Sequence, residues 1–198
     1  MSKIILKPDE SGTLYDKDLK VRINKYGTLT DNQVVLSQYA LQMANAYVHA
    51  TIPDATVLVA HNMFLGTLCE YAFALWLFEH DHDFQTDLCI GRPDKFDMKI
   101  YDELYDMKST NIDYCMYVKK YHVDNKPAIY VWCQRNVYND NSAVVTLLGW
   151  NTPDDIKEHG KLIDRFEDIK YQVHKSVWRS MDGLAMYLND KSKTCSKS

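Results

Sequence analysis

The residues with the clearest chemical potential lie in segment 96–110, which reads as a β-hairpin. Its first arm carries Asp97 and its second arm carries Asp106 and Lys108. Side chains alternate along a strand, so Asp106 and Lys108 point to one face, and a turn at Asp102-Glu103 brings Asp97 close to it. Two carboxylates can hold a hard divalent cation, and an ammonium stabilises an attacking water or the developing negative charge. The spacing therefore predicts a divalent-metal phosphodiesterase site.

A further acid, Glu70, lies in an apolar helix predicted over residues 61–80. A helix that is apolar on most sides is typically buried, here most simply against a sheet. Gly66 and Ala74 lie four residues to either side of Glu70, so small residues line this face and allow a close approach to another element. Carboxylates are seldom buried without a partner. Glu70 therefore either joins the proposed site or forms a salt bridge in the core.

Each of these residues also has an ordinary structural interpretation. An Asp-x-Lys triplet occurs often by chance, and on an edge strand it is usually a solvated surface that discourages aggregation. Asp97 could be an exposed hairpin residue. The conjunction favours the catalytic interpretation: a helix acid, a strand acid and an acid-x-lysine strand are followed by further strands and another helix.

Three helices must position these residues. Helical spacing of apolar residues predicts the first from an N-cap at Thr30 or Asp31 to about Ala50. The second is the Glu70 helix. The third begins at Thr152-Pro153, where a threonine cap, a proline and an acid three residues after the cap form a helix-start pattern.

The remaining periodicity is that of strands. We expect strands in segments 88–90, 96–100, 104–109, 128–133 and 144–150. Segment 114–123 fits either a helix or a strand, and 160–180 is ambiguous. We expect one α/β domain over 1–198, with an N-terminal extension and helix in 1–55, a catalytic core in 56–160 and a disordered tail in 189–198.

The order and spacing of these motifs resemble the PD-(D/E)xK nuclease superfamily, including phage-type members. Segment 66–72 is similar to the first core helix with its glutamate, 96–99 to the motif-aspartate strand, and 105–110 to the (D/E)xK strand. A weaker likeness is segment 148–156, a strand, glycine, aromatic residue and helix start. The resemblance implies a three-layer α/β/α restriction-endonuclease-like core around a central mixed sheet, and Mg²⁺-dependent cleavage of DNA.

The resemblance also implies roles for individual residues. Asp97 and Asp106 would hold Mg²⁺, or Mn²⁺ in its place, and Lys108 would assist the nucleophile. Glu70 would orient a water on the cation or contribute to a second metal position. The triplet has aspartate where glutamate is commoner, and the literal Pro-Asp pair is Pro93-Asp94, so Asp94 and Asp97 both stay candidates for the motif aspartate. Gln134 occupies a position where some members place an accessory polar residue.

Composition sets the wider limits. The chain has 198 residues, 46% hydrophobic and 25% charged, with a formal net charge of −4, which does not by itself indicate a nucleic-acid binder. A local basic groove remains compatible with it, and candidate residues are Lys119, Lys120, Lys157, Lys161, Arg165, Lys170, Lys175 and Arg179. Their other interpretation is ordinary surface charge interleaved with acids.

Targeting signals and cysteines indicate the compartment. Five cysteines without CxxC spacing fit a reducing environment, and no signal peptide or uninterrupted membrane-spanning apolar run is evident. We therefore expect a cytoplasmic protein without a membrane partner, in the host cytoplasm if a phage encodes it. His80-x-His82 could bind a transition metal but is more often a solvated corner.

The function expected from the sequence is a Mg²⁺-dependent deoxyribonuclease that acts on DNA, by analogy an endonuclease and a homodimer. Two alternatives stay open. One is a non-catalytic DNA-binding or inhibitor module on the same fold, and the other is a structural or assembly protein in which Glu70 is paired in the core.

Overall fold

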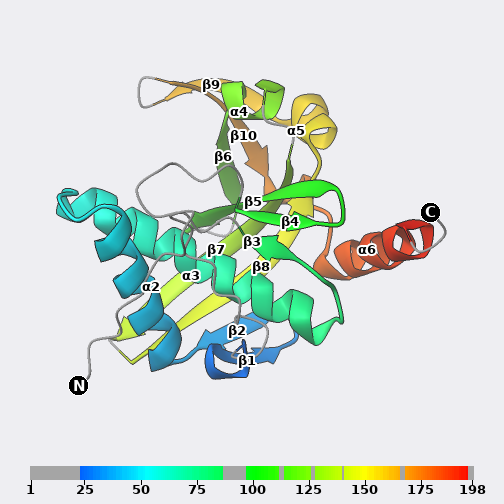
Figure 1. Cartoon of the computed structure of the whole chain (residues 1–198). Helices are drawn as coiled ribbons and strands as arrows, with labels where there is room; N and C mark the ends of the chain where they lie inside the picture. Colours follow the sequence, from blue (N-terminus) through cyan, green and yellow to red (C-terminus); the bar gives the residue numbers. More distant parts are fainter. Residues whose placement is uncertain are drawn as a thin grey trace.

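The computed structural model shows a mixed α/β protein built on two β-sheets (Figure 1). The structure describes residues 23–86, 97–111, 114–125, 128–139, 141–165 and 168–195. The larger sheet has seven strands and the smaller one has three. The α/β class expected from the sequence is confirmed.

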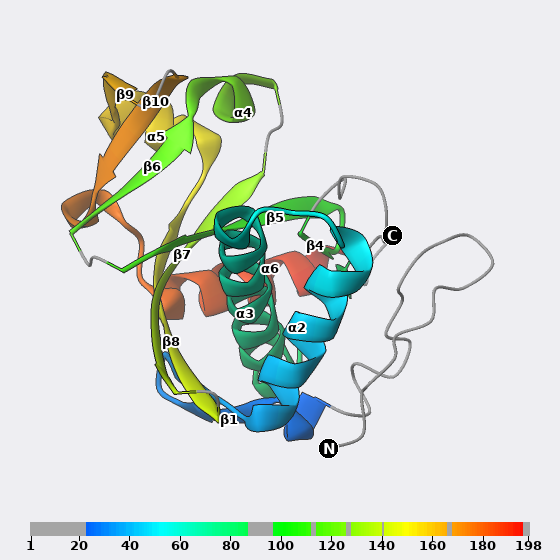
Figure 2. The ribbon, with the colours of Figure 1, turned by 90° about the vertical axis from the view of Figure 1, so that its left-hand side faces the viewer.

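The larger sheet is mixed and runs in the order β1-β2-β8-β7-β5-β4-β3. Its strands are β1 (Gly27–Thr30), β2 (Gln33–Leu36), β3 (Gln85–Thr86), β4 (Met98–Ile100), β5 (Glu103–Thr110), β7 (Ile129–Asn139) and β8 (Ser142–Asn151). The pairing of β5 with β7 is parallel, and the other described pairings in this sheet are antiparallel. The sheet curls around a helix, as Figure 2 shows for β7 and β8.

Helices α2 (Gln38–Thr51) and α3 (Val57–Glu79) lie on the concave side of this sheet (Figure 2). Their N-caps are Ser37 and Thr56, whose side chains accept backbone N–H groups in the first turn. Most of α3 from Leu65 onward is buried, because the helix fills the curl and its apolar residues meet the sheet. Helix α6 (Met181–Cys195) contacts β8 and completes the same core.

The smaller sheet lies on the other side of β7. It comprises β6 (Cys115–Lys119), β10 (Asp168–His174) and β9 (Lys161–Arg165), in that order and all antiparallel. With α4 (Lys120–Asn125) and α5 (Pro153–His159) it builds a second core, to which β7 contributes Tyr130 and Trp132. Alternation along β7 therefore sends odd-numbered residues such as Val131 toward α3 and even-numbered ones toward the smaller sheet. Short 3₁₀ turns complete the described elements at Ile23–Lys25 (η1) and Lys175–Val177 (η2).

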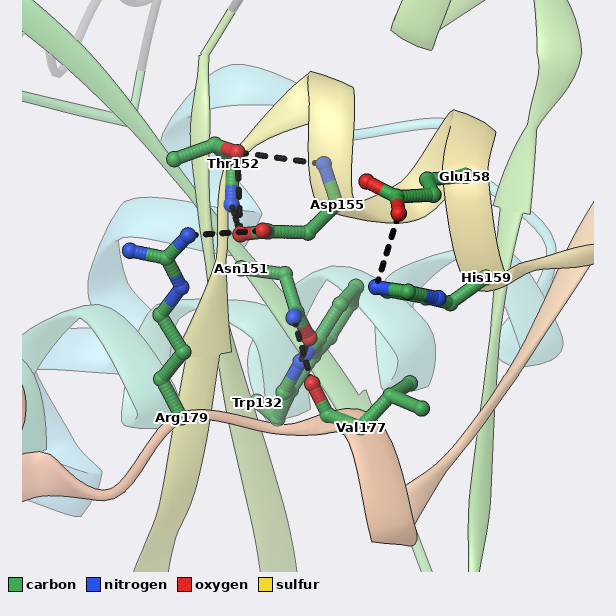
Figure 3. A network of polar contacts seen from close by, with 8 residues as sticks. All are labelled: Trp132, Asn151, Thr152, Asp155, Glu158, His159, Val177 and Arg179. Atoms are coloured by element: carbon green, nitrogen blue, oxygen red, sulfur yellow. Dashed lines mark hydrogen bonds and ion pairs between the residues drawn. The ribbon is translucent and has the colours of Figure 1, made fainter.

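A polar network fastens the end of β8 to the chain that follows β10 (Figure 3). The buried Asn151 accepts a hydrogen bond from Trp132 Nε1 at 2.6 Å and donates to the carbonyl of Val177 at 2.8 Å. Beside it, Thr152 caps α5 in a capping box with Asp155, and Arg179 donates to Asp155 at 2.7 Å. Buried amide groups must be paired, so this network fixes the approach of the two segments.

Several expectations are confirmed by these elements. The hairpin itself is present between β4 and β5, but it turns at Tyr101 and Asp102, one residue earlier than predicted, because Glu103 already pairs with Ile100. The helix predicted to begin at Thr152-Pro153 does so, with proline in the first turn. The undecided segment 114–123 contains both a strand and a helix start, because β6 passes directly into α4.

The predicted start of the first helix was wrong. Residues 27–36 form the β1–β2 hairpin, with Asp31 at φ 53° in its turn, and the helix begins at Gln38. The alternating burial of Val34 and Leu36 is the strand period, which the run of apolar residues around Val35 had concealed.

The ends of the chain also differ from expectation. Helix α6 continues through Cys195, so most of segment 189–198 is helical rather than frayed, and Lys191 Nζ in this part donates to Glu103 at 2.8 Å. Segment 88–90 lies outside the described residues. Helix α3, at 23 residues, is long and apolar enough to cross a membrane by length and composition, but from Leu65 onward most of it is buried in the core.

Candidate active site

Asp97 lies directly before β4, where the hairpin begins. Antiparallel pairing of Met98 with Tyr105 places Asp97 opposite Asp106. One carboxylate oxygen of Asp97 accepts the backbone N–H of Met107 at 2.8 Å, and its carboxyl group lies close enough to that of Asp106 for the two charges to interact. The first arm of the hairpin therefore places Asp97 against the second strand, β5.

Asp106 and Lys108 lie on the same face of β5, as their spacing predicts. Lys108 Nζ makes a close ion pair with Asp106 Oδ1. Their side chains are 20% and 28% exposed, respectively, so both groups are reachable from solvent while the pair is partly desolvated. The structure thus brings Asp97, Asp106 and Lys108 together into one polar cluster, which we call the carboxylate cluster.

The electrostatics of the carboxylate cluster are unfavourable for two ionised acids. Burial raises the pKa of Asp97, the negative charge of Asp106 raises it further, and Lys108 only partly opposes them, so that the pKa is about 8. A buried carboxylate beside a second carboxylate holds its proton more tightly, because ionisation would place two like charges in a poorly solvated space. A bound cation would relieve the same repulsion.

Glu70 lies on α3, the helix that crosses β7 and β5. The neighbouring Cys69 lies close to Cys133 of β7, and one turn later Phe73 packs against Tyr105 of β5 with ring centroids 6.0 Å apart. The Glu70 side chain is half-buried and makes interactions of its own. Among the described residues, no group of three or more Asp, Glu, His or Cys side chains is arranged to hold a metal ion.

The surroundings of Glu70 differ from the close contact that its small neighbours suggest. A Cβ atom built on Gly66 meets no atom within 4 Å, so the glycine faces open space within the described part of the chain. Ala74 is instead buried in the core. The Glu70 face therefore changes from open to packed along the helix.

The secondary candidates have mixed outcomes. Asp94 and Pro93 lie outside the described residues. Gln134 pairs with Thr110 across the β5–β7 ladder, which places it on the same face as Lys108, one side-chain repeat further along. His82 is buried and its Nε2 has no hydrogen-bond partner among the described residues, whereas His80 Nδ1 bonds the Trp76 carbonyl at 2.7 Å.

Several of the basic residues are paired with acids. Lys120 and Lys157 both pair with Asp124, and Arg179 pairs with Asp155. Their interpretation as surface charge interleaved with acids therefore fits better than a groove made from all of them. The lysines of the smaller sheet, Lys119, Lys161 and Lys170, form a separate group on one face.

Two residues near the cluster were missed in the sequence. Tyr130 pairs with Asp106 across the parallel β5–β7 ladder, and its buried hydroxyl has no hydrogen-bond partner in the part of the chain that the structure describes. Burial raises the pKa of Tyr130 and the charge of Asp106 raises it further. Arg135, also on β7, donates to Ser109, the residue after Lys108. No local signal could reveal either, because both depend on the register between strands that are distant in sequence.

Known proteins add no further constraint on this site. The Asp97 and Asp106 carboxylates, with Lys108 beside them, must be interpreted from their own geometry. The chain matches no known protein family, no curated protein and no solved structure.

Proposed function

We propose that this protein is a Mg²⁺-dependent deoxyribonuclease that hydrolyses DNA phosphodiester bonds, as an endonuclease. The observation that carries the proposal is the contact between Asp97 and Asp106, held beside Lys108 on the hairpin. Repulsion between the two carboxylates destabilises the fold. Acids whose pKa is shifted by such a neighbour are common at functional sites.

The donor set of the carboxylate cluster fits Mg²⁺. This ion prefers octahedral oxygen ligands, keeps several waters and takes only one or two protein carboxylates. Asp97 and Asp106 supply two carboxylates, one of them oriented by the Met107 N–H. Mn²⁺ accepts the same oxygen ligands.

The residues divide the chemistry as follows. When bound, the cation neutralises charge on the phosphoryl oxygens and assists the departing 3′ oxygen. Lys108 positions the attacking water and stabilises the negative charge that develops on the phosphate. The role assigned to Glu70 is to orient a water near the phosphate, which it would have to do from α3, the helix packed on the face of β5 opposite to Asp106 and Lys108.

The same interpretation extends to the fold. We propose that the larger sheet is the centre of a three-layer α/β/α restriction-endonuclease-like core. In support, the β4–β5 hairpin is followed by the parallel β5–β7 pair, α3 lies on one side of the sheet and α4 and α5 lie on the other. We also propose a cytoplasmic location and a homodimer, which would allow both DNA strands to be cut.

A cleavage assay tests the function. Purified protein is incubated with plasmid and linear DNA in Mg²⁺, in Mn²⁺ and in chelator, and compared with Asp106→Asn and Lys108→Met. The same hairpin offers matched controls in Asp102→Asn and Lys99→Met, because Asp102 is 95% exposed in the turn and pairs with Lys99. We expect metal-dependent cutting that both site variants lose and both controls keep.

Other outcomes identify the alternatives. DNA that is retarded in a gel but never cut indicates a non-catalytic binding or inhibitor module. A protein that neither binds nor cuts DNA indicates a structural or assembly role. Cutting that persists in both site variants would rule out the carboxylate cluster as the active site.

A further inference from the structure

The smaller sheet has one apolar face and one polar face. Met116, Val118, Tyr171 and Val173 point into the second core. Alternation and register place the intervening residues on the opposite face, which we call the basic face: Cys115, Tyr117 and Lys119 of β6, Lys161 and Ile163 of β9, and Asp168, Lys170, Gln172 and His174 of β10. The strand period thus separates the two sets across one sheet.

The basic face is turned away from the protein core. The helices that pack on this sheet, α4 and α5, do so through Val123 and Ile156, which belong to the second core on the apolar face. Lys119 and Lys161 are exposed, and Tyr117, Lys170 and Gln172 are half-buried. Gln172 Nε2 lies 3.4 Å from the Tyr117 hydroxyl, which holds the two polar groups side by side in the middle of the face.

The charge of the basic face is opposite to that of the whole chain. In the described part of this face three lysines stand against one acid, Asp168, whereas the formal net charge of the protein is −4. Lys119 pairs with Asp168 at 2.8 Å, but its side chain is 54% exposed, and exposed pairs of this kind contribute about 1 kcal/mol or less. Lys161 makes no ion pair within the described part of the chain. Lys119 and Lys161 can therefore bind an external anion.

We propose that the basic face binds the phosphate backbone of DNA. The three lysines place several positive charges on one surface, and proteins that track a DNA strand combine such charges with an aromatic ring, the part that Tyr117 would play here. The proposal rests on the proposed function in that the bound DNA is the nuclease substrate. The strand β6 begins soon after β5 ends and contacts it, so the smaller sheet adjoins the element that carries Asp106 and Lys108.

Fluorescence anisotropy with a labelled DNA oligonucleotide, single-stranded or duplex, tests this inference. The full chain is titrated in chelator, so that no cleavage occurs, over a series of salt concentrations. The variant replaces Lys119, Lys161 and Lys170 by Gln. The matched control replaces Lys120, Lys157 and Lys193 by Gln, which removes the same charge from exposed positions elsewhere.

We expect the basic-face variant to bind at least about tenfold more weakly and to lower the salt slope of log Kd by about 2 to 3, because three phosphate contacts are lost. The control should keep the slope within about 1 of the unmodified protein. Circular dichroism and the thermal midpoint verify that both variants are folded. Equal weakening in variant and control, an unchanged slope, or a protein that binds no DNA would overturn the inference.

The two proposals fail separately. If DNA binds through the basic face but is not cut in Mg²⁺ or Mn²⁺, the nuclease proposal is rejected and the DNA-binding proposal is supported. If cutting is metal-dependent and the basic-face variant binds DNA with unchanged affinity, the nuclease proposal is supported and DNA binding by the basic face is rejected.

Discussion

Asp97 accepts the backbone N–H of Met107 at 2.8 Å, a contact between the two arms of one hairpin. The N–H belongs to the residue between Asp106 and Lys108, so it holds the first acid at the midpoint of the acid-x-lysine triplet. The carboxylate cluster is therefore assembled by a segment of about a dozen residues, and its geometry follows the pairing of β4 with β5. Placing a site on paired strands gives it the rigidity that catalysis requires.

Lys108 should affect turnover more than DNA affinity. We expect Lys108→Met to lower kcat by about 10² to 10⁴, because a positioned group that assists proton transfer or charge development is lost. Lys108→Arg retains the charge and should be impaired less. The measurement is single-turnover cleavage at saturating Mg²⁺, with Lys99→Met as the control on the neighbouring strand. A loss of affinity with unchanged kcat would contradict the assigned role.

Asp97 should make the metal-free protein less stable at alkaline pH. Its pKa is about 8 in the folded state against 3.8 for a solvated aspartate, so the folded state holds the proton more tightly between these values. The stabilisation that Asp97 contributes through this proton is then fully present below about pH 4, and it is lost as pH rises through about 8. Urea unfolding in chelator from pH 5 to 9 measures the loss, which Asp97→Asn should abolish.

Two further measurements check the Asp97 interpretation. Asp102→Asn, in the exposed turn of the same hairpin, should leave the pH dependence unchanged. Added Mg²⁺ should restore stability above pH 8, because the ionised carboxylates are the form that binds the cation. Parallel pH profiles for the unmodified protein and Asp97→Asn would refute the assignment.

His82 should produce the opposite pH dependence. Burial lowers the pKa of His82 and the neighbouring His80 lowers it further, so the unfolded chain takes up the proton first. The stability contribution is fully present above the ordinary pKa of 6.5 and is lost as pH falls below it. The thermal midpoint between pH 8 and pH 5 should fall less in His82→Asn than in the unmodified protein. The exposed His61→Asn on α3 is the control, and an identical fall in His82→Asn would count against the prediction.

Asn151 should be important for stability. Asn151→Ala leaves Trp132 Nε1 and the Val177 carbonyl without their partners in a buried place, which should cost about 2 to 4 kcal/mol of unfolding free energy. Asn125→Ala removes an exposed amide that bonds Tyr121 and should change stability by about 0.5 kcal/mol or less. Urea unfolding compares the two, and equal effects would show that the network of Figure 3 is not structural.

The local parts of the site could be predicted from the sequence. A two-residue spacing is enough to place Asp106 and Lys108 on one face, and it is confirmed by their ion pair. The start of α5 could be predicted for the same reason, because the capping box lies within four consecutive residues. The long apolar pattern of α3 identified a buried helix, although its start lies at Val57 rather than near His61. The catalytic roles of Glu70, Asp97, Asp106 and Lys108 remain predictions.

The tertiary structure alone decided what depends on distant pairing. The parallel register of β5 with β7 places Tyr130 opposite Asp106, and the smaller sheet joins β6 to β10 to form the basic face. Strand β2 was mistaken for helix because four residues carry too little periodicity to identify a strand before its partner β8 is known. Side-chain alternation is a property of neighbouring residues and can be read along the chain. The choice of partner strand is set by the burial of whole faces, which exists only once the chain has folded.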